Sequence, residues 1–573
     1  MRVRLGPSAL FLAACGAFAA AITARRLGDF DLPWHLATGR VIAQTHQVPK
    51  IDPLAFTHEP LRYVEPLGDL ASWGLYRAFG PLGLQMIGGA VAWIVAATLF
   101  AHARKSAVTF GLVALVLAAL AGWLVVRPAT ISFAFIAYEL MVLERHRRAP
   151  DEPRARIGLA TLPLVALVWG NVHGFVAFGV WLLLGYFGYR VLSRYALGRW
   201  ARAEDGRALG ATALVAVATV VAGCVNPGGP RLLLGPARFG EDLGGIADFT
   251  RTSWTFFLQN EPLPLVVAVL GIVALLVRSE ERVTLWDVGL VTGGLAGYAL
   301  VIRTIPLGML LVASVIVRRL GAAKVRPALA WALAFTPLLA AAQALIHADT
   351  SAGIGFEPSH FPGRAVAWVE RASPRGRMWN FWPYGGYLAF TLYPDHLVLM
   401  DGRNALARSP ELTRRVHASG ASSSAFESLV AQYDLQWAIV SARESERQSA
   451  PIAQSPAWTM VHLDDVAAVY VRREGPNAPL AAGGFRVLRH LTPPDVVLQM
   501  GIEGTRAQDL AHDGALARAQ DPESARAAFY AVCGALAMRD RAQFGQAWAA
   551  FKEIAPEHPA AAMLLQTGRE LMP

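Results

Sequence analysis

The chain has 573 residues, of which 54% are hydrophobic and 16% charged, with a formal net charge of +10. Its apolar residues form long uncharged runs rather than single helix faces, which excludes an ordinary soluble protein and predicts a polytopic membrane protein. The excess positive charge lies mostly in the loops between these runs, so it does not indicate nucleic-acid binding. Three cysteines, two of them in apolar runs, predict neither a disulfide framework nor a cysteine-based metal site.

The apolar runs predict about eleven membrane-spanning helices, each long enough to cross the hydrocarbon layer or nearly so. The runs at 129–143 and 157–170 are the shortest for such a role. The predicted spans are 6–24, 83–103, 107–126, 129–143, 157–170, 174–193, 208–225, 262–278, 284–302, 304–317 and 328–346.

Basic residues predict the orientation of these spans, because loops rich in lysine and arginine stay in the cytoplasm. With eleven spans the groups of basic residues fall on one side. The short loops of the other side carry only isolated basic residues such as Arg127 and Arg303, and the pair Arg25 and Arg26 is a local violation. The N-terminus is therefore expected in the cytoplasm, with loop 25–82 and everything after about residue 347 exported. The first span is expected to be retained, not cleaved. The residues on the cytoplasmic side are Arg2, Arg4, Arg104, Lys105, Arg145, Arg147, Arg148, Arg154, Arg156, Arg194, Arg199, Arg202, Arg207, Arg278, Arg282, Arg318, Arg319, Lys324 and Arg326.

Two carboxylates, Asp29 and Asp31, follow the first span directly. Residues separated by one position point to the same side only when the backbone is extended, which Gly28 and Pro33 favour. The pair then suits an active site at a membrane surface. A simpler interpretation is that Asp31 caps the helix beginning near Pro33, and the sequence leaves both open.

The rest of loop 25–82 predicts two helices at the membrane surface, joined by a turning connector at 48–53. The first carries Trp34, Ala37, Val41 and Ile42 on one face, with His35 on another. The second follows Pro66, ahead of the span near Gly83.

From residue 348 the composition becomes that of a soluble protein. Residues 348–473 predict a small exported α/β domain, with a helix at 363–371, helices near 410–433 and strands at 376–380, 397–400, 437–440 and 466–471. A linker at 476–479 precedes a helical region, 480–573, in which 524–538 and 544–554 form a hairpin like one tetratricopeptide unit. The fold class is therefore an α-helical polytopic membrane protein with an exported α/β domain.

Several motifs in register resemble bacterial GT-C type membrane glycosyltransferases, in a branch that is largely uncharacterised. The resemblance covers roughly residues 1–473 and suggests a bacterial inner-membrane protein with a periplasmic domain. The motifs are Asp29-Phe30-Asp31 with Trp34–Arg40, Val48–Pro53, Arg127-Pro128, Trp169–Gly174, Asn226-Pro227-Gly228, Arg303–Leu307, Asn380–Leu388 and Met400-Asp401-Gly402-Arg403.

The resemblance implies a transferase, of the inverting type, that moves a sugar from a polyprenyl-phosphate donor to a lipid or envelope-glycan acceptor at the exported face. Such chemistry needs a carboxylate to take the acceptor proton, a role for Asp29 or Asp31, and cations at the phosphate. Arg127 and Arg303 suit the phosphate because a guanidinium binds it with a fork of donors. Each arginine is equally well explained as snorkelling to lipid headgroups.

Further polar residues are weaker candidates for the site. His173, beside Asn171, suits donor phosphate or sugar, although a satisfied buried histidine is the commoner case. Glu65, Asp69 and Asp52 are secondary acidic candidates; Asp52 is more simply a turn former and Asp69 a solvated position. Asp401, Gly402, Arg403 and the turn 384–387 suit acceptor recognition, although a tight turn explains the glycines of 384–387 more simply. No metal site is predicted from the ligand spacing. Two aspartates alone would hold a divalent cation only weakly, so the sequence leaves such a cation open without supporting it.

Two other classes of function stay open at the level of sequence. A non-catalytic GT-C-like scaffold could bind an envelope partner through the exported domain. A transporter would carry ionisable groups near the membrane midplane, whereas here the acidic residues gather at the exported edge.

Overall fold

The computed structural model describes residues 6–61, 65–103, 106–196, 208–238, 253–259, 262–279, 281–321, 326–346, 348–403, 410–443, 449–557 and 560–571. The chain divides into two compact units. One comprises Met1–Lys50 and Arg62–Glu357, and the other Ile51–Leu61 and Pro358–Pro573. Of the basic residues used to predict orientation, Arg2, Arg4, Arg104, Lys105, Arg199, Arg202, Arg207 and Lys324 lie outside the described residues.

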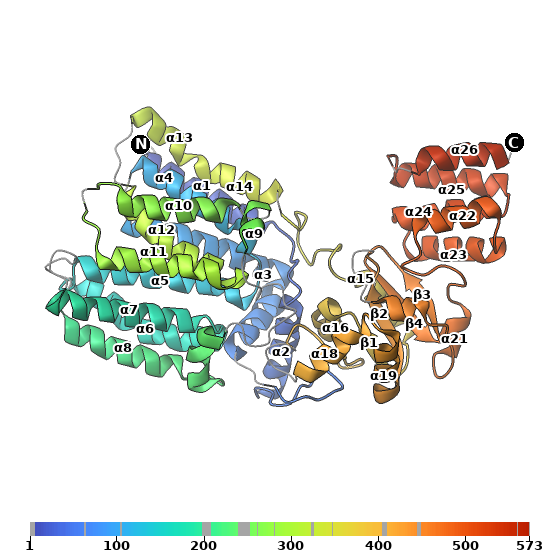
Figure 1. Ribbon diagram of the computed structural model, residues 1–573, viewed down its shortest axis with the longest axis horizontal. Coiled ribbons are helices and arrows are strands. Elements are labelled where there is room, and N and C mark those ends of the chain that lie inside the picture. Colours follow the sequence, from blue (N-terminus) through green and yellow to red (C-terminus); the bar gives the residue numbers. More distant parts are fainter. Residues whose placement is uncertain are drawn as a thin grey trace. The chain divides into compact units, whose positions relative to one another are not determined.

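The first unit is a stack of helices (Figure 1), and a helix is present at each predicted span. Within the described residues, four helical segments are long and apolar enough to cross a membrane: Pro66–Ala101, Pro153–Val172, Val176–Tyr195 and Ala328–Ile346. The number eleven therefore stays a prediction. The helices are α1 (Pro7–Thr23), α2 (Leu32–Thr45), α3 (Pro66–His102), α4 (Ala107–Leu120), α5 (Pro128–Arg148), α6 (Pro153–Val172), α7 (Val176–Tyr195), α8 (Leu209–Gly223), α9 (Trp254–Gln259), α10 (Pro262–Leu276), α11 (Leu285–Leu300), α12 (Ile305–Arg319), α13 (Pro327–Ala334) and α14 (Thr336–Ile346), with the 3₁₀ turns η1 (Ala121–Trp123), η3 (Gly229–Arg238) and η5 (Ile302–Thr304).

Helix α3 combines the second predicted surface helix and the span that follows it. A kink divides the two parts at Gly80, whose φ of 62° lies in the left-handed region that glycine enters without a steric penalty. Pro81 follows, and its missing N–H also interrupts the helical hydrogen bonds. Other helices of this unit, among them α2, α5, α6 and α12, begin with proline at the first or second position, where the N–H would be unsatisfied in any case.

Several of the arginines used to predict orientation are buried in ion pairs instead of lying in solvated loops. At the C-terminal ends of α5 and α12, Glu144 accepts two hydrogen bonds from Arg147, at 2.9 and 2.8 Å, and faces Arg318 at 3.5 Å. Arg318 also pairs with Asp287 of α11, which closes the capping box of that helix. These arginines tie helix ends together, so they carry less information about topology than exposed loop residues would.

The second unit contains a mixed four-stranded sheet in the order β1-β2-β4-β3, with β1 parallel to β2 and the other pairs antiparallel. The predicted strands at 376–380, 437–440 and 466–471 are confirmed as β1 (Arg377–Asn380), β2 (Leu435–Ser441) and β4 (Ala467–Arg472). Strand β3 (Trp458–Leu463) was not predicted. The strand predicted at 397–400 is wrong, because that segment makes only an isolated bridge, Val398 to Ala55. Around the sheet lie α15 (Gly363–Ala372), η6 (Trp382–Tyr384), α16 (Gly385–Leu392), α18 (Pro410–Ser419), α19 (Ser423–Tyr433) and α20 (Ala450–Gln454).

The predicted linker at 476–479 is instead part of the packed domain. Asn477 is buried and donates hydrogen bonds to the carbonyl oxygens of Arg375 and Gln436. Layered helices follow α21 in Figure 1, and α24 packs against both α23 and α25. The predicted hairpin corresponds to α24 and α25. The bounds are α21 (Ala478–Ala482), α22 (Pro494–Glu503), α23 (Ala507–Gln520), α24 (Ala525–Ala537), α25 (Arg541–Ile554) and α26 (Ala561–Leu571).

Candidate active site

Five charged side chains from separate helix ends of the first unit converge. Asp29 and Asp31 precede α2, Glu65 precedes α3, Arg127 precedes α5, and Arg303 lies in η5 ahead of α12. Arg127 faces Asp29 and Asp31, while the charges of Arg127 and Arg303 both act on Asp31 and Glu65. We call these five residues the carboxylate–arginine cluster. The sequence named all five as candidates, Glu65 only as a secondary one.

The two aspartates converge by a different geometry from the predicted extended backbone. The Asp31 N–H donates a hydrogen bond of 2.9 Å to Oδ1 of Asp29, and Asp31 itself has helical dihedral angles. This Asx-type turn places both carboxylates near Arg127, whose Nη1 lies 3.5 Å from Asp29 Oδ2 and 3.9 Å from Asp31 Oδ2. The aspartates therefore share one cation.

Asp31 does not cap helix α2. It occupies the capping position, but its side chain accepts no hydrogen bond from the helix backbone. Oδ1 of Asp31 accepts instead from the indole Nε1 of Trp34, at 3.1 Å. The simpler interpretation from sequence is therefore wrong for this residue, and its carboxylate is directed at side chains that bear charge or a polar N–H.

The surroundings of Asp31 raise the pKa of its carboxyl group to about 6. Burial is the main cause and the charge of Asp29 adds to it, while Arg127, Arg303 and the Trp34 hydrogen bond act in the opposite direction. A carboxylate with such a pKa is still largely ionised at neutral pH and is a stronger base than an ordinary aspartate.

Glu65 lies between two histidines. His173 Nε2 is 3.6 Å from Glu65 Oε1, and His35 Nδ1 is 4.0 Å from Oε2. His35 also meets Asp69, with 2.6 Å between Nδ1 and Oδ1. Burial raises the pKa of Glu65 to about 7, with Asp31 adding to it, against the lowering effects of Arg303, a Gly174 backbone hydrogen bond and Arg127. The sequence missed His35, which it placed off the apolar face of a surface helix, and His35 is buried. Asp69 is buried too, so its interpretation as a solvated position is wrong.

Two glycines allow the close helix packing that brings these groups together. A Cβ at Gly39 of α2 would lie 2.2 Å from the carbonyl oxygen of Asp69, so α2 and α3 can touch only with glycine here. A Cβ at Gly68 of α3 would lie 2.7 Å from the carbonyl oxygen of Val172, at the end of α6. These contacts fix His35 beside Asp69 and bring Glu65 toward His173.

The hydrogen bonds of His173 define its tautomer. The Phe175 N–H donates to Nδ1 of His173 at 3.1 Å, so the neutral ring carries its proton on Nε2, the atom that faces Glu65. Burial, with the charges of Arg303, Arg127 and His35, holds the pKa of His173 well below its usual value. Ser132 Oγ, which accepts from Trp169 Nε1 at 2.9 Å, lies on the other side of the ring. His173 is thus a neutral donor directed at Glu65.

Other predicted residues have structural roles. Asn171 donates to the carbonyl oxygens of Leu167 and Val225 and so ties the end of α6 to the following segment. Asp52 belongs to the second unit, where it is fully buried, accepts from the Leu54 N–H and pairs with Arg403.

The residues proposed for acceptor recognition are also built into the second unit. Arg403 pairs with Asp401 as well as Asp52, and all three are buried. The predicted turn at 384–387 is instead the start of α16, where a Cβ at Gly385 would lie 2.0 Å from the carbonyl oxygen of Met400.

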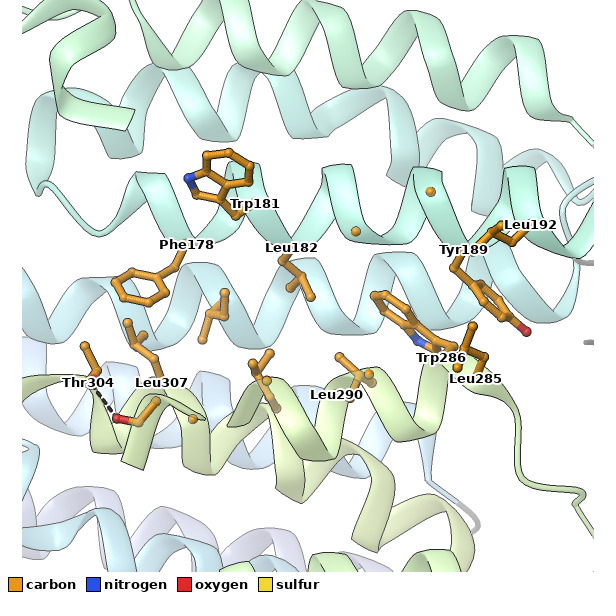
Figure 2. Close-up of a pocket in the computed structure, with 18 residues that line it drawn as sticks. Phe178, Trp181, Leu182, Tyr189, Leu192, Leu285, Trp286, Leu290, Thr304 and Leu307 are labelled. Atoms are coloured by element: carbon orange, nitrogen blue, oxygen red, sulfur yellow. Dashed lines mark hydrogen bonds between the residues drawn. The ribbon is translucent and has the colours of Figure 1, made fainter. Parts of the chain in front are cut away.

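An apolar groove of about 480 Å³ runs along the first unit between α7 and the pair α11 and α12. Figure 2 shows Phe178, Thr304 and Leu307 toward one end, and Tyr189, Leu192, Leu285 and Trp286 toward the other. The first end includes Thr304, the residue directly after Arg303 of the charged cluster. The guanidinium of Arg303 lies 6.0 Å from the Phe175 ring centroid. Gly185, Gly188, Gly289 and Gly293 line the groove, and a Cβ at any of them would meet open space.

Among the described residues, no group of three or more His, Cys, Asp and Glu side chains is arranged to hold a metal ion. No protein-family model matches the sequence. No curated protein matches it either.

Solved oligosaccharyltransferase structures share the fold. The oligosaccharyltransferase AglB from Archaeoglobus fulgidus, in complex with an inhibitory peptide and a dolichol-phosphate, superposes with a TM-score of 0.54 at 12% identity, over 81% of this chain and 74% of that one. The predicted GT-C resemblance is confirmed as a similarity of fold. The A. fulgidus oligosaccharyltransferase tethered to an acceptor peptide gives 0.50 at 11% identity, over 82% of this chain and 74% of that one. ArnT from Cupriavidus metallidurans bound to undecaprenyl phosphate gives a TM-score of 0.40 at 15% identity, over 81% of this chain and 97% of that one.

We predict from the cluster that a lysine, which keeps the positive charge but not the guanidinium geometry, cannot replace Arg127 or Arg303. Arg127→Lys and Arg303→Lys should leave the protein folded but lower kcat/KM for the glycosyl transfer that the sequence predicts by about tenfold or more, because one charge-assisted hydrogen bond contributes about 1.5–3 kcal/mol. Arg278→Lys, at an exposed position after α10, is the matched control. Transfer rates and melting temperatures are measured in the same detergent. Unchanged rates in both cluster variants would assign the arginines to headgroup anchoring.

Proposed function

We propose that the protein is a membrane glycosyltransferase that moves a sugar from a polyprenyl-phosphate donor to an envelope acceptor. The observation that carries the proposal is an apolar groove with Thr304 toward one end (Figure 2), next in the chain to Arg303 of the carboxylate–arginine cluster. A lipid-linked phosphate has the matching chemistry, with an anionic group at the end of a long hydrocarbon chain. The shared fold with an archaeal oligosaccharyltransferase supports the same class of reaction.

In this proposal Arg127 and Arg303 bind the donor phosphate, and Asp31 is the general base. As the sugar–phosphate bond breaks, negative charge grows on the phosphate, and two preorganised guanidinium groups stabilise it. Asp31 takes the proton of the acceptor hydroxyl as that oxygen attacks C1, and Asp29 keeps Arg127 and Asp31 in place through its contacts with both. Attack from the face opposite the leaving phosphate inverts the configuration at C1. His173 holds Glu65 beside the phosphate.

The polyprenyl chain lies in the groove along α7. The groove is lined almost entirely by apolar side chains and by glycines whose missing side chains leave room for a branched hydrocarbon. Its sides include well-exposed Trp181 and Leu192, so a chain can enter laterally from the hydrocarbon layer. The reaction then takes place at the exported face of a bacterial inner membrane, with the N-terminus in the cytoplasm and the second unit exported.

Removing the base should abolish turnover without unfolding the protein. Asp31→Asn keeps size and the hydrogen bond from Trp34 but cannot accept a proton, so the transfer rate should fall by ~10²–10⁴-fold. Asp151→Asn, at an exposed position between α5 and α6, is the matched control. Transfer rates with a polyprenyl-phosphate-linked sugar are compared between variants whose melting temperatures match that of the wild type.

Because Asp29 could substitute as base, the double variant Asp29→Asn, Asp31→Asn is measured as well. Full activity of the double variant would leave a non-catalytic scaffold as the better account.

Filling the groove should weaken donor binding selectively. Gly293→Leu adds a side chain where the structure has open space, so the helix should tolerate it while the polyprenyl chain loses contacts. Loss of two buried methylene contacts, at about 0.8 kcal/mol each, predicts a rise in KM of about tenfold for a long-chain donor and little change for a short-chain one. Gly210→Leu, on an open face of α8 outside the groove, is the control. Equal KM values in both variants would remove the groove from donor binding.

A further inference from the structure

The charges of the cluster do not suit an anionic donor unless one carboxylate is neutral. Within the described residues, the charges of Arg127 and Arg303 act on the carboxylates of the cluster, while His35 pairs with Asp69, and a phosphodiester would bring a further negative charge to the same place. Asp31 must stay ionised to act as base, and Asp29 contacts Arg127 at 3.5 Å. Glu65 differs from the two aspartates in its neighbours, because its carboxyl group meets the imidazoles of His173 and His35, at 3.6 and 4.0 Å, where the aspartates meet the guanidinium of Arg127. Its side chain is 12% exposed, so its ionised form is poorly solvated.

We propose that Glu65 carries a proton when the donor binds and is the general acid of the reaction, delivering that proton to the departing phosphate oxygen. The inference rests on the proposed function and adds a second proton-transfer residue to it. His35 and Asp69 are positioning residues in this scheme: Asp69 accepts the Nδ1 proton of His35 at 2.6 Å, which directs that proton to Asp69 and leaves the proton of Glu65 for the substrate.

The proton and electron balance follows from these roles. The bond between C1 and the phosphate oxygen breaks, its electron pair goes to that oxygen, and the oxygen takes the proton of Glu65. The acceptor oxygen forms the new bond to C1, and its proton goes to Asp31. Glu65 ends ionised and Asp31 protonated, so the site resets when Asp31 loses a proton to water and Glu65 gains one.

The groups that face Glu65 come from several elements and determine the expected pH range. Arg127 and Arg303 favour its ionised form, as does the Gly174 backbone hydrogen bond, whereas burial and Asp31 favour the protonated form; His35, Asp69 and neutral His173 complete its surroundings. Asp31, with a pKa of about 6, must be ionised, and Glu65, with a pKa of about 7, must be protonated. Activity should therefore peak between these values, with an acid limb from Asp31 and an alkaline limb from Glu65.

Kinetics of the amide variants assign the two limbs. Glu65→Gln keeps size and can still donate a hydrogen bond but cannot transfer a proton, so kcat/KM should fall by ~10²–10⁴-fold and the alkaline limb should disappear. Asp31→Asn should remove the acid limb instead. An alkaline limb that persists in Glu65→Gln overturns the inference while leaving the proposed glycosyl transfer intact.

A binding measurement tests the proton on Glu65 without turnover. The probe is the methyl phosphodiester of undecaprenyl phosphate, which keeps a single negative charge across this pH range and carries no sugar. Calorimetry at pH 8 in buffers of different ionisation enthalpy should show that the wild type takes up about one proton on binding, because the phosphate raises the pKa of Glu65 further. Glu65→Gln should take up none, and Glu152→Gln, at an exposed position before α6, should behave as the wild type.

The outcomes separate the two claims. A wild type that does not bind the probe overturns the proposed function and this inference together. Binding without proton uptake, or uptake that persists in Glu65→Gln, overturns only the role of Glu65. The wild-type measurement stands without the variant, so poor folding of Glu65→Gln would not remove the test.

Discussion

The site depends on one electrostatic constraint: carboxylates and guanidinium groups share a confined space at the ends of apolar helices. Moving a charge into such surroundings is costly unless an opposite charge or a proton compensates it. Here Arg127 compensates Asp29 and Asp31, while Glu65 is opposed strongly enough that its pKa rises to about 7. The burial and the neighbouring negative charges that destabilise the ionised forms also raise the pKa of Asp31 to about 6 and that of Glu65 to about 7.

Backbone packing holds these charges in place. Gly39 and Gly68 allow α2, α3 and the end of α6 to approach closely, and this packing sets His35 against Asp69 and Glu65 near His173. At the opposite helix ends a second set of buried ion pairs, with Glu144, Arg147, Arg318 and Asp287, ties α5, α11 and α12 together. Since α12 also borders the groove, its anchored end helps to keep the groove open and Arg303 in position.

The sequence predicted the helices well, and it named the charged residues that the structure brings together at their ends, because both follow from local patterns. Long apolar runs end at Arg127 and Arg303, and the alternation of basic loops placed these arginines on the same side as Asp29 and Asp31. The sequence did not reveal features that depend on contacts between residues distant in the chain. His35 falls off the apolar face of its own helix, and only the close approach at Gly39 buries it against Asp69. Asp52 resembles a loop carboxylate in the sequence, but it is buried and pairs with Arg403, which lies 351 residues away in the chain. Strand β3 and the packing of Asn477 likewise depend on tertiary partners.

The central claim is that a lipid phosphate binds between Arg127 and Arg303 with its chain in the groove along α7. An experimental structure of the full chain in lipid nanodiscs with undecaprenyl phosphate tests it most directly. The account predicts phosphate oxygens within hydrogen-bond distance of both guanidinium groups, and the first isoprene units between Phe178 and Leu307. A phosphate bound away from both arginines, or a chain that leaves the groove empty, would contradict it.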